Sequence, residues 1–186
     1  VLLLLLTVRN VIASKKIKKS TFKNPVLFMS LFLFLSVPFL IGHNGSLDPM
    51  VNVTFAVTSI IVGLHEEIVF RAILQNYLLR TLGEWRSIFL TSVIFTMWHI
   101  GAIDPQISLF ANVAFASLIL GIIYAKTQSL FLVVILHSLY DAISSFTGEF
   151  PIISNSDGVI IIAISFVGVS LWGRIHRVSS TVSKEA

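Results

Sequence analysis

The sequence predicts an all-α protein, a polytopic transmembrane helical bundle of about six complete spans that forms a single membrane domain, residues 1–186. The first reason is composition, because 55% of the residues are hydrophobic and only 12% are charged. Soluble domains carry about 25% charged residues. The second reason is that apolar residues gather in runs suited to crossing a bilayer. The third is that basic residues lie in short segments between these runs.

Six apolar segments account for the expected helices. They cover residues 25–41, 50–79, 85–103, 106–125, 130–146 and 158–173. The first follows a Lys-rich stretch, residues 9–24, and the third follows a short polar segment that contains Arg80 and has Arg86 near its own start. The others follow linkers rich in turn-forming residues, which are residues 42–49, 104–105, 127–129 and 148–157. The second segment is too long for one perpendicular span, so we expect it to tilt or to extend past the membrane.

Two further features limit what the chain can be. Residues 1–8 are apolar but too few to span, since a helix needs about 20 residues to cross a bilayer. We therefore interpret the chain as N-terminally truncated, with residues 1–8 as the end of a helix. The chain has no cysteine, which excludes disulfide bonds and thiolate metal sites.

The distribution of charge predicts a topology. If residues 9–24 are cytoplasmic, six alternating spans place Arg80, Arg86, Lys126 and the C-terminal tail on the same side. The opposite linkers contain Asp48, Asp104, Glu149 and Asp157 but neither Lys nor Arg. This pattern follows the positive-inside rule and predicts that both the Lys-rich segment and the C-terminus are cytoplasmic. It also favours membrane lipid as a partner and argues against nucleic acid.

Ionisable residues within the apolar segments are the candidates for function. A charge at bilayer depth costs at least about 2.5–3.5 kcal/mol, so such residues usually face the bundle interior and serve a function. At about 1.5 Å per residue, three helices place their ionisable groups about 16–22 Å from their cytoplasmic ends. A single shared site explains this common depth. The residues are Glu66, Glu67, Arg71, His99, His137 and Asp141.

Helical spacing separates these residues into two groups. Glu67 and Arg71 are four residues apart and can pair, which we interpret as a structural pair because a buried Arg requires a carboxylate partner. Glu66 points about 100° away from Glu67 and remains available for chemistry. With His99 and His137, the Glu66 carboxylate suits a divalent metal such as zinc.

A metal-free route is equally open from the residues alone. Glu66 and His99 would hold and deprotonate a water, and His137 with its neighbour would stabilise an oxyanion. Both routes lead to hydrolysis of an amide.

Three short motifs follow one another along the chain and carry a resemblance to a known family. Residues 66–71 fit EExxxR, residues 95–99 fit FxxxH, and residues 137–141 fit Hxxx(N/D). In this order they resemble the CPBP family of intramembrane metalloproteases, also called the Abi or CAAX-protease self-immunity family. That family is related to the type II CAAX-prenyl endopeptidase. The resemblance extends over residues 60–146, which we take as the catalytic core.

The resemblance implies an intramembrane endopeptidase of a bacterial cell membrane, acting on a peptide or membrane-protein substrate. It implies that Glu66 and His99 activate water and that His137 and Asp141 form the oxyanion side. The eukaryotic enzymes have Asn where Asp141 stands. Because an ionised Asp cannot donate a hydrogen bond, Asp141 must be protonated, orient His137 or bind a metal.

Two other functions use the same residues. Intramembrane Glu, His and Asp residues also form proton relays, so a proton-coupled transporter is one alternative, although the chain has no repeat halves of the kind that transporters show. The other alternative is a non-catalytic membrane scaffold or immunity factor that retains the fold. A Glu66→Gln variant with retained biological activity would favour the scaffold.

Overall fold

The computed structural model describes residues 24–41, 48–101, 106–146 and 152–182. Residues 1–23, which include the predicted helix end and most of the Lys-rich segment, lie outside the described part. The described residues form a helical bundle, which confirms the predicted fold class. Its helices are α2 (Pro25–Ile41), α3 (Pro49–Glu67), η2 (Ile68–Gln75), α4 (Asn76–Leu82), α5 (Glu84–Trp98), α6 (Ile107–Thr127), α7 (Leu130–Phe146) and α8 (Asn155–Val182).

The helices α3, η2 and α4 run on as one helical rod, Pro49–Leu82, of 34 residues. At about 1.5 Å per residue it is about 50 Å long, longer than the roughly 30 Å hydrocarbon core of a bilayer. The rod begins at Asp48, whose side chain accepts a hydrogen bond from the Met50 amide at 2.8 Å, with Pro49 as the first helical residue. It ends at Gly83, whose φ of 78° lets the chain turn directly into α5.

Two helices differ most from the predicted segments. The third predicted segment, residues 85–103, ends as a helix at Trp98, so His99 lies just beyond the helix. The last begins at Asn155, not at residue 158, and continues to Val182. Its earlier start is explained by Ser154, whose hydroxyl accepts a hydrogen bond from the Asp157 amide at 3.1 Å and caps the helix.

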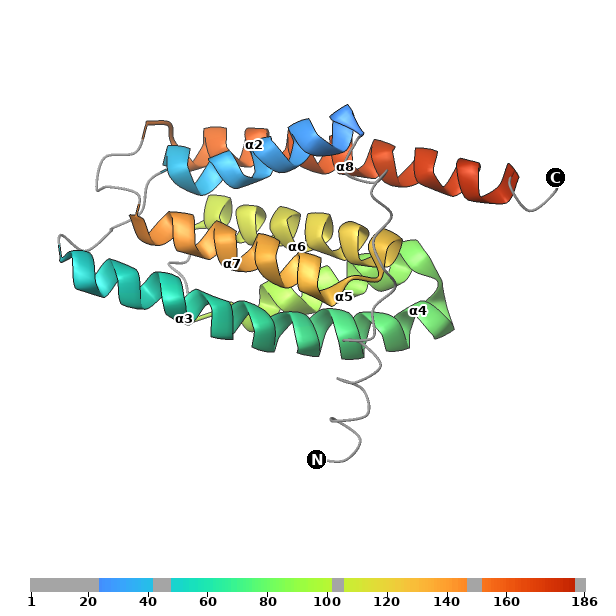
Figure 1. Ribbon diagram of the computed structural model, residues 1–186, viewed down its shortest axis with the longest axis horizontal. Helices are drawn as coiled ribbons and strands as arrows, with labels where there is room; N and C mark the ends of the chain where they lie inside the picture. Colours follow the sequence, from blue (N-terminus) through green and yellow to red (C-terminus); the bar gives the residue numbers. More distant parts are fainter. Residues whose placement is uncertain (1–23, 42–47, 102–105, 147–151, 183–186) are drawn as a thin grey trace, which may run out of the picture.

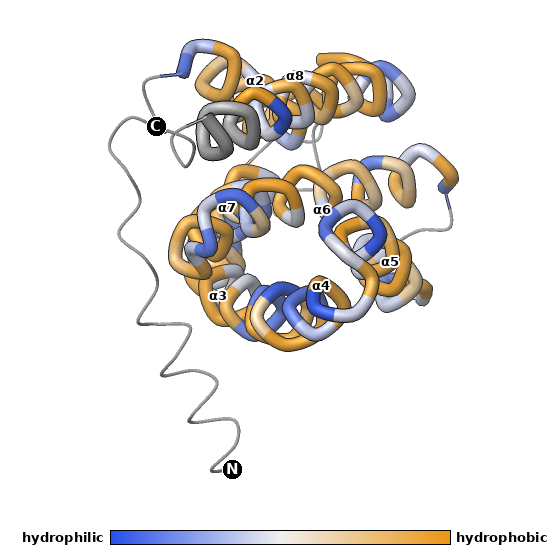
Figure 2. Tube along the Cα trace, turned by 90° about the vertical axis from the view of Figure 1, so that its right-hand side faces the viewer, coloured by the Kyte–Doolittle hydropathy of each residue, from blue (hydrophilic) through white to orange (hydrophobic). Residues whose placement is uncertain are grey.

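The bundle has two parts, visible when it is viewed end-on (Figure 2). Five segments, α3, α4, α5, α6 and α7, surround one common axis, and α2 and α8 lie together over α6 and α7. Packing follows this arrangement, because α2 contacts α8 and α7, α3 contacts α7, and α6 contacts both α8 and α5. Figure 1 shows the same layers from the side.

The surface is that of an integral membrane protein. Large apolar side chains point outward from several helices, among them Phe28, Phe55, Ile61, Phe89 and Phe131. Several polar and charged side chains are buried instead, among them Glu67, Arg71 and Gln75. Within the described residues, three helical stretches are long and apolar enough to cross a membrane, Pro49–Leu82, Ile107–Thr127 and Asn155–Ile175, while Pro25–Ile41 and Leu130–Phe146 are apolar but shorter.

Close packing of α3 on α7 sets the position of the candidate site. The Ser59 hydroxyl donates to the Ser138 carbonyl at 3.1 Å, and one turn further along α3, Gly63 faces the same residue. A Cβ on Gly63 would lie 2.6 Å from the Ser138 hydroxyl oxygen. Small residues four positions apart let two membrane helices approach closely. The contact brings the end of α3 beside His137, the residue that precedes Ser138.

Candidate active site

The two glutamates lie where the regular α-helix gives way to a π-helix. Glu67 is the last residue of α3, and the π-helix η2 follows it directly. At the end of η2, the Asn76 amide donates to the carbonyl of Arg71, five residues earlier. Short π-helical stretches are rare and are frequent at functional sites. Sequence reasoning did not anticipate this one, since hydrophobic periodicity does not distinguish a widened turn.

Glu67 binds two partners at once. One carboxylate oxygen, Oε2, accepts a hydrogen bond from Arg71 Nε at 2.9 Å, and both side chains are fully buried. This is the contact that the four-residue spacing predicts. The other oxygen, Oε1, lies 2.8 Å from His137 Nδ1. Because a carboxylate in an ion pair only accepts, Nδ1 carries the hydrogen. Glu67 therefore orients an imidazole as well as pairing with Arg71.

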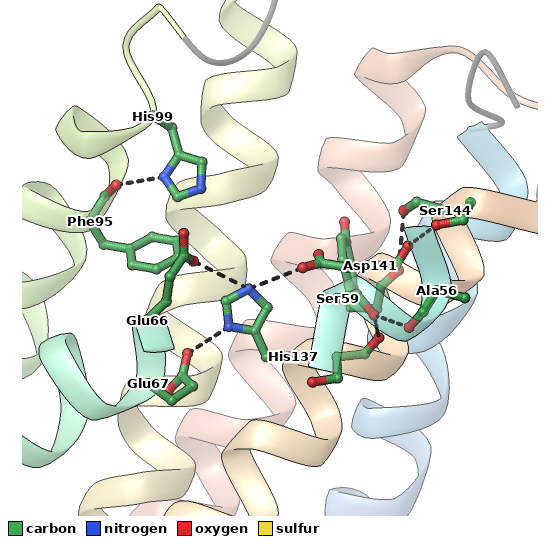
Figure 3. Close-up of polar contacts among 12 residues, drawn as sticks. Ala56, Ser59, Glu66, Glu67, Phe95, His99, His137, Asp141 and Ser144 are labelled. Carbon is green, nitrogen blue, oxygen red and sulfur yellow. Dashed lines mark hydrogen bonds and ion pairs between the residues drawn. The ribbon is translucent and has the colours of Figure 1, made fainter. Parts of the chain in front are cut away.

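The second nitrogen of His137 faces two further carboxylates (Figure 3). Its Nε2 lies 3.6 Å from Glu66 Oε2 and 3.5 Å from Asp141 Oδ2. Carboxylates therefore lie beside both ring nitrogens of His137. Exposure of the side chains increases outward, from 0% for Glu67 through 10% for His137 to 38% for Asp141. The cluster is therefore closed behind Glu67 and open on the side of Asp141.

His99 approaches the cluster from α5. Its Nδ1 lies 2.8 Å from the carbonyl oxygen of Phe95, the acceptor that the next turn of α5 would otherwise use. The amides of His99 and Ile100 bond instead to Thr96 and Met97, three residues back, and the helix ends. A carbonyl oxygen only accepts, so Nδ1 carries a hydrogen, and in the neutral tautomer the lone pair is on Nε2. Figure 3 shows this ring on the side of the Glu66 carboxylate.

The ring of Phe95 packs against both imidazoles. Its centroid is 4.6 Å from that of His99 and 5.9 Å from that of His137. The Arg71 guanidinium carbon lies 5.4 Å from the same centroid, within the range of a cation–π contact. Phe95 is 4% exposed. It thus joins α5 to the charged cluster.

The arrangement brings together five of the six predicted residues by direct contact, Glu66, Glu67, Arg71, His137 and Asp141. The sixth, His99, reaches the cluster through Phe95. Among the residues that the structure describes, no three His, Asp or Glu side chains are grouped so as to hold a metal ion.

Three hydrogen bonds tie the rod to α6, and none was predicted. Arg71 Nη2 donates to the Ser117 hydroxyl at 3.0 Å. One turn later, Gln75 Nε2 donates to the Gly121 carbonyl at 2.9 Å. Asn76 Nδ2 then donates to the Tyr124 hydroxyl at 2.8 Å. We call these three contacts the polar zipper. Its sequence signal is three polar residues, Arg71, Gln75 and Asn76, on one side of an otherwise apolar helix.

Comparison with known protein families matches residues 48–143 to the family described as type II CAAX prenyl endopeptidase Rce1-like. The match covers about half of the chain and all six predicted site residues. No curated protein and no solved structure matches the chain.

Proposed function

Because this chain belongs to the Rce1-like family of type II CAAX prenyl endopeptidases, a family of proteases, we propose that it is an intramembrane endopeptidase. It hydrolyses a peptide bond of a membrane-associated or peptide substrate with a water activated by Glu66 and His99. One observation carries the proposal above the others. His137 Nε2 stands between the carboxylates of Glu66 and Asp141, while Glu67 holds the opposite nitrogen.

The water lies between Glu66 and His99 in this mechanism. Its two O–H groups donate to the Glu66 carboxylate and to Nε2 of His99, the nitrogen that has the lone pair in the neutral ring whose Nδ1 donates to Phe95. A water held in this way directs its oxygen lone pair at the substrate carbonyl carbon. Glu66 takes a proton as the C–O bond forms, which is general-base catalysis. The result is a tetrahedral intermediate with a negatively charged oxygen.

His137 stabilises the negatively charged oxygen by a hydrogen bond. With Nδ1–H bound to Glu67, its Nε2–H is the donor that remains for the oxyanion. Asp141 lies 3.5 Å from the same nitrogen and orients the ring, so the role that fits its position is that of a positioning residue. Glu66 then returns its proton to the leaving amine nitrogen as the C–N bond breaks. Atoms and charges balance without a further reactant.

The test compares two Glu→Gln variants in the purified, detergent-solubilised or reconstituted chain. Glu66→Gln removes the base, and Glu84→Gln is the matched control at the far end of the rod, where Glu84 pairs with Lys126. The substrates are fluorogenic peptides with and without an S-farnesyl cysteine three residues before the C-terminus. We expect Glu66→Gln to lower kcat by about 10²–10⁴ and Glu84→Gln to leave it within about twofold. Equal cleavage by both variants would contradict the mechanism.

Ion-driven uptake by liposomes carrying the protein, without peptide cleavage, would identify a transporter instead. Unchanged biological activity of Glu66→Gln in cells would identify a scaffold.

A further inference from the structure

Two buried polar atoms beside the polar zipper lie near the same glycine, Gly121, and have opposite hydrogen-bonding character. Arg71 Nη1, a donor, and Gln75 Oε1, an acceptor, have no hydrogen-bond partner within the described part of the chain. Both side chains are almost fully buried, at 0% and 1% exposure. Buried polar groups in native proteins are nearly always satisfied, by protein or by ordered water. An orphaned donor beside an orphaned acceptor therefore points to a bridging molecule.

The orientation of Gln75 follows from its other contact. Its Nε2 donates to the Gly121 carbonyl at 2.9 Å, and a carbonyl only accepts, so the amide nitrogen and oxygen cannot exchange places. Oε1 consequently faces away from that carbonyl. It borders the space above Gly121, because a Cβ on this glycine would lie 3.3 Å from Oε1 and 3.7 Å from Arg71 Nη1. Both atoms therefore lie beside Gly121, together with Ile88 Cγ2, which would be 3.1 Å from the same Cβ.

We propose that one buried water occupies this space, accepting from Arg71 Nη1 and donating to Gln75 Oε1. The water makes Gln75 a positioning residue for the proposed hydrolysis. A water with two polar partners in a buried polar site is a regular part of protein structure. It adds a link to a continuous chain of contacts: Gln75 to the water, the water to Arg71, Arg71 to Glu67 at 2.9 Å, and Glu67 to His137 at 2.8 Å.

The contacts of Gln75 and Asn76 in the polar zipper therefore have different roles. The contact of Asn76 with Tyr124 joins the rod to α6 but does not reach Arg71. The contact made by Gln75 joins the same two helices and also orients the guanidinium that fixes Glu67. Loss of Gln75 therefore displaces the imidazole that stabilises the oxyanion, whereas loss of Asn76 affects packing alone.

The inference rests on the proposed peptidase function and is tested by a pair of neighbouring substitutions. Gln75→Met keeps the shape of the side chain and removes both polar atoms, and Asn76→Leu is the matched control. In the fluorogenic peptide assay, we expect Gln75→Met to lower kcat by about 10- to 100-fold with KM unchanged. Asn76→Leu keeps kcat within about twofold, although its thermal unfolding temperature falls. Wild-type kcat in folded Gln75→Met would overturn the proposal.

A second variant covers the case in which Gln75→Met does not fold. Gly121→Ala leaves the carbonyl contact to Gln75 in place and fills the space with a methyl group, so it should lower kcat in the same way. An active Gly121→Ala enzyme with wild-type kcat would equally overturn the inference. If the wild-type chain cleaves no peptide, the proposed function fails by itself. A high-resolution structure then decides the water site, since density between Arg71 Nη1 and Gln75 Oε1 supports it and an empty position refutes it.

Discussion

Removal of the charges of Glu67 and Arg71, separately and together, should separate the stability of the bundle from its activity. Both side chains are fully buried and joined at 2.9 Å. A single substitution of either leaves a charge buried without its partner, which costs about 3–5 kcal/mol. Substitution of both by Met removes the pair as a unit. The double variant loses the partners of His137 Nδ1 and the Ser117 hydroxyl, at about 1–3 kcal/mol for each unsatisfied group.

The double-mutant cycle therefore has a predicted sign and size. The two single substitutions together sum to about 6–10 kcal/mol, while the double variant costs about 2–6 kcal/mol. The midpoints of these ranges give a coupling energy of about 4 kcal/mol in favour of the pair. Activity behaves differently, because Glu67 also holds His137 Nδ1 at 2.8 Å. The double variant should recover stability relative to the single variants but remain inactive.

The measurement is equilibrium unfolding of the four proteins in mixed micelles, paired with peptide cleavage by the folded fraction of each. Additive stability losses would show that the pair contributes nothing as a pair. Cleavage at the wild-type rate by the folded double variant would refute the orienting role of Glu67, even if the coupling energy had the expected size.

Three further predictions concern packing and metal dependence. Gly63→Ala should destabilise the protein by about 1–2 kcal/mol, because its Cβ would lie 2.6 Å from the Ser138 hydroxyl oxygen, and addition of Ser138→Ala should reverse most of this loss in the same unfolding assay; no reversal would contradict the predicted contact. Phe95→Leu removes ring contacts with both imidazoles and should cost about 1 kcal/mol of stability. It should also lower the kcat of the folded protein, because the two rings lose a neighbour that positions them. An unchanged kcat would mean that the Phe95 ring does not position the imidazoles. Treatment with EDTA or phenanthroline should leave kcat within about twofold, whereas a loss restored by added zinc would contradict the metal-free route.

The fold could be predicted from the sequence because its main signal is local. Runs of apolar residues interrupted by turn-forming residues and charges predict each helix directly, and the 34-residue rod was recognisable by its excess length. The pairing of Glu67 with Arg71 was predictable for the same reason, since four residues separate them along one helix. The similar distances of the candidate residues from the ends of their helices also predicted that they share one site.

What could not be predicted depends on contacts between distant segments. The carboxylate of Glu67 and the ring of His137 are 70 residues apart in sequence, and no spacing rule joins them. For that reason Glu67 was interpreted only as a partner of Arg71. The position of His99 beyond the end of α5 was missed as well. It depends on Nδ1 of His99, which bonds to the Phe95 carbonyl in place of a backbone amide. A hydropathy pattern contains no information on which donor binds this carbonyl.

The π-helix between Ile68 and Gln75 has a consequence for when the site can exist. The sequence IVFRAILQ contains good α-helix formers and neither Gly nor Pro, so its local preference is for the ordinary helical turn. A peptide of this stretch alone has no second helix to hold the wider turn open, and we expect it to form a regular α-helix in micelles. The relative directions of Glu66 and Gln75 are therefore set by the assembled bundle. We therefore expect the geometry of the candidate site to form only when helices already in the membrane associate.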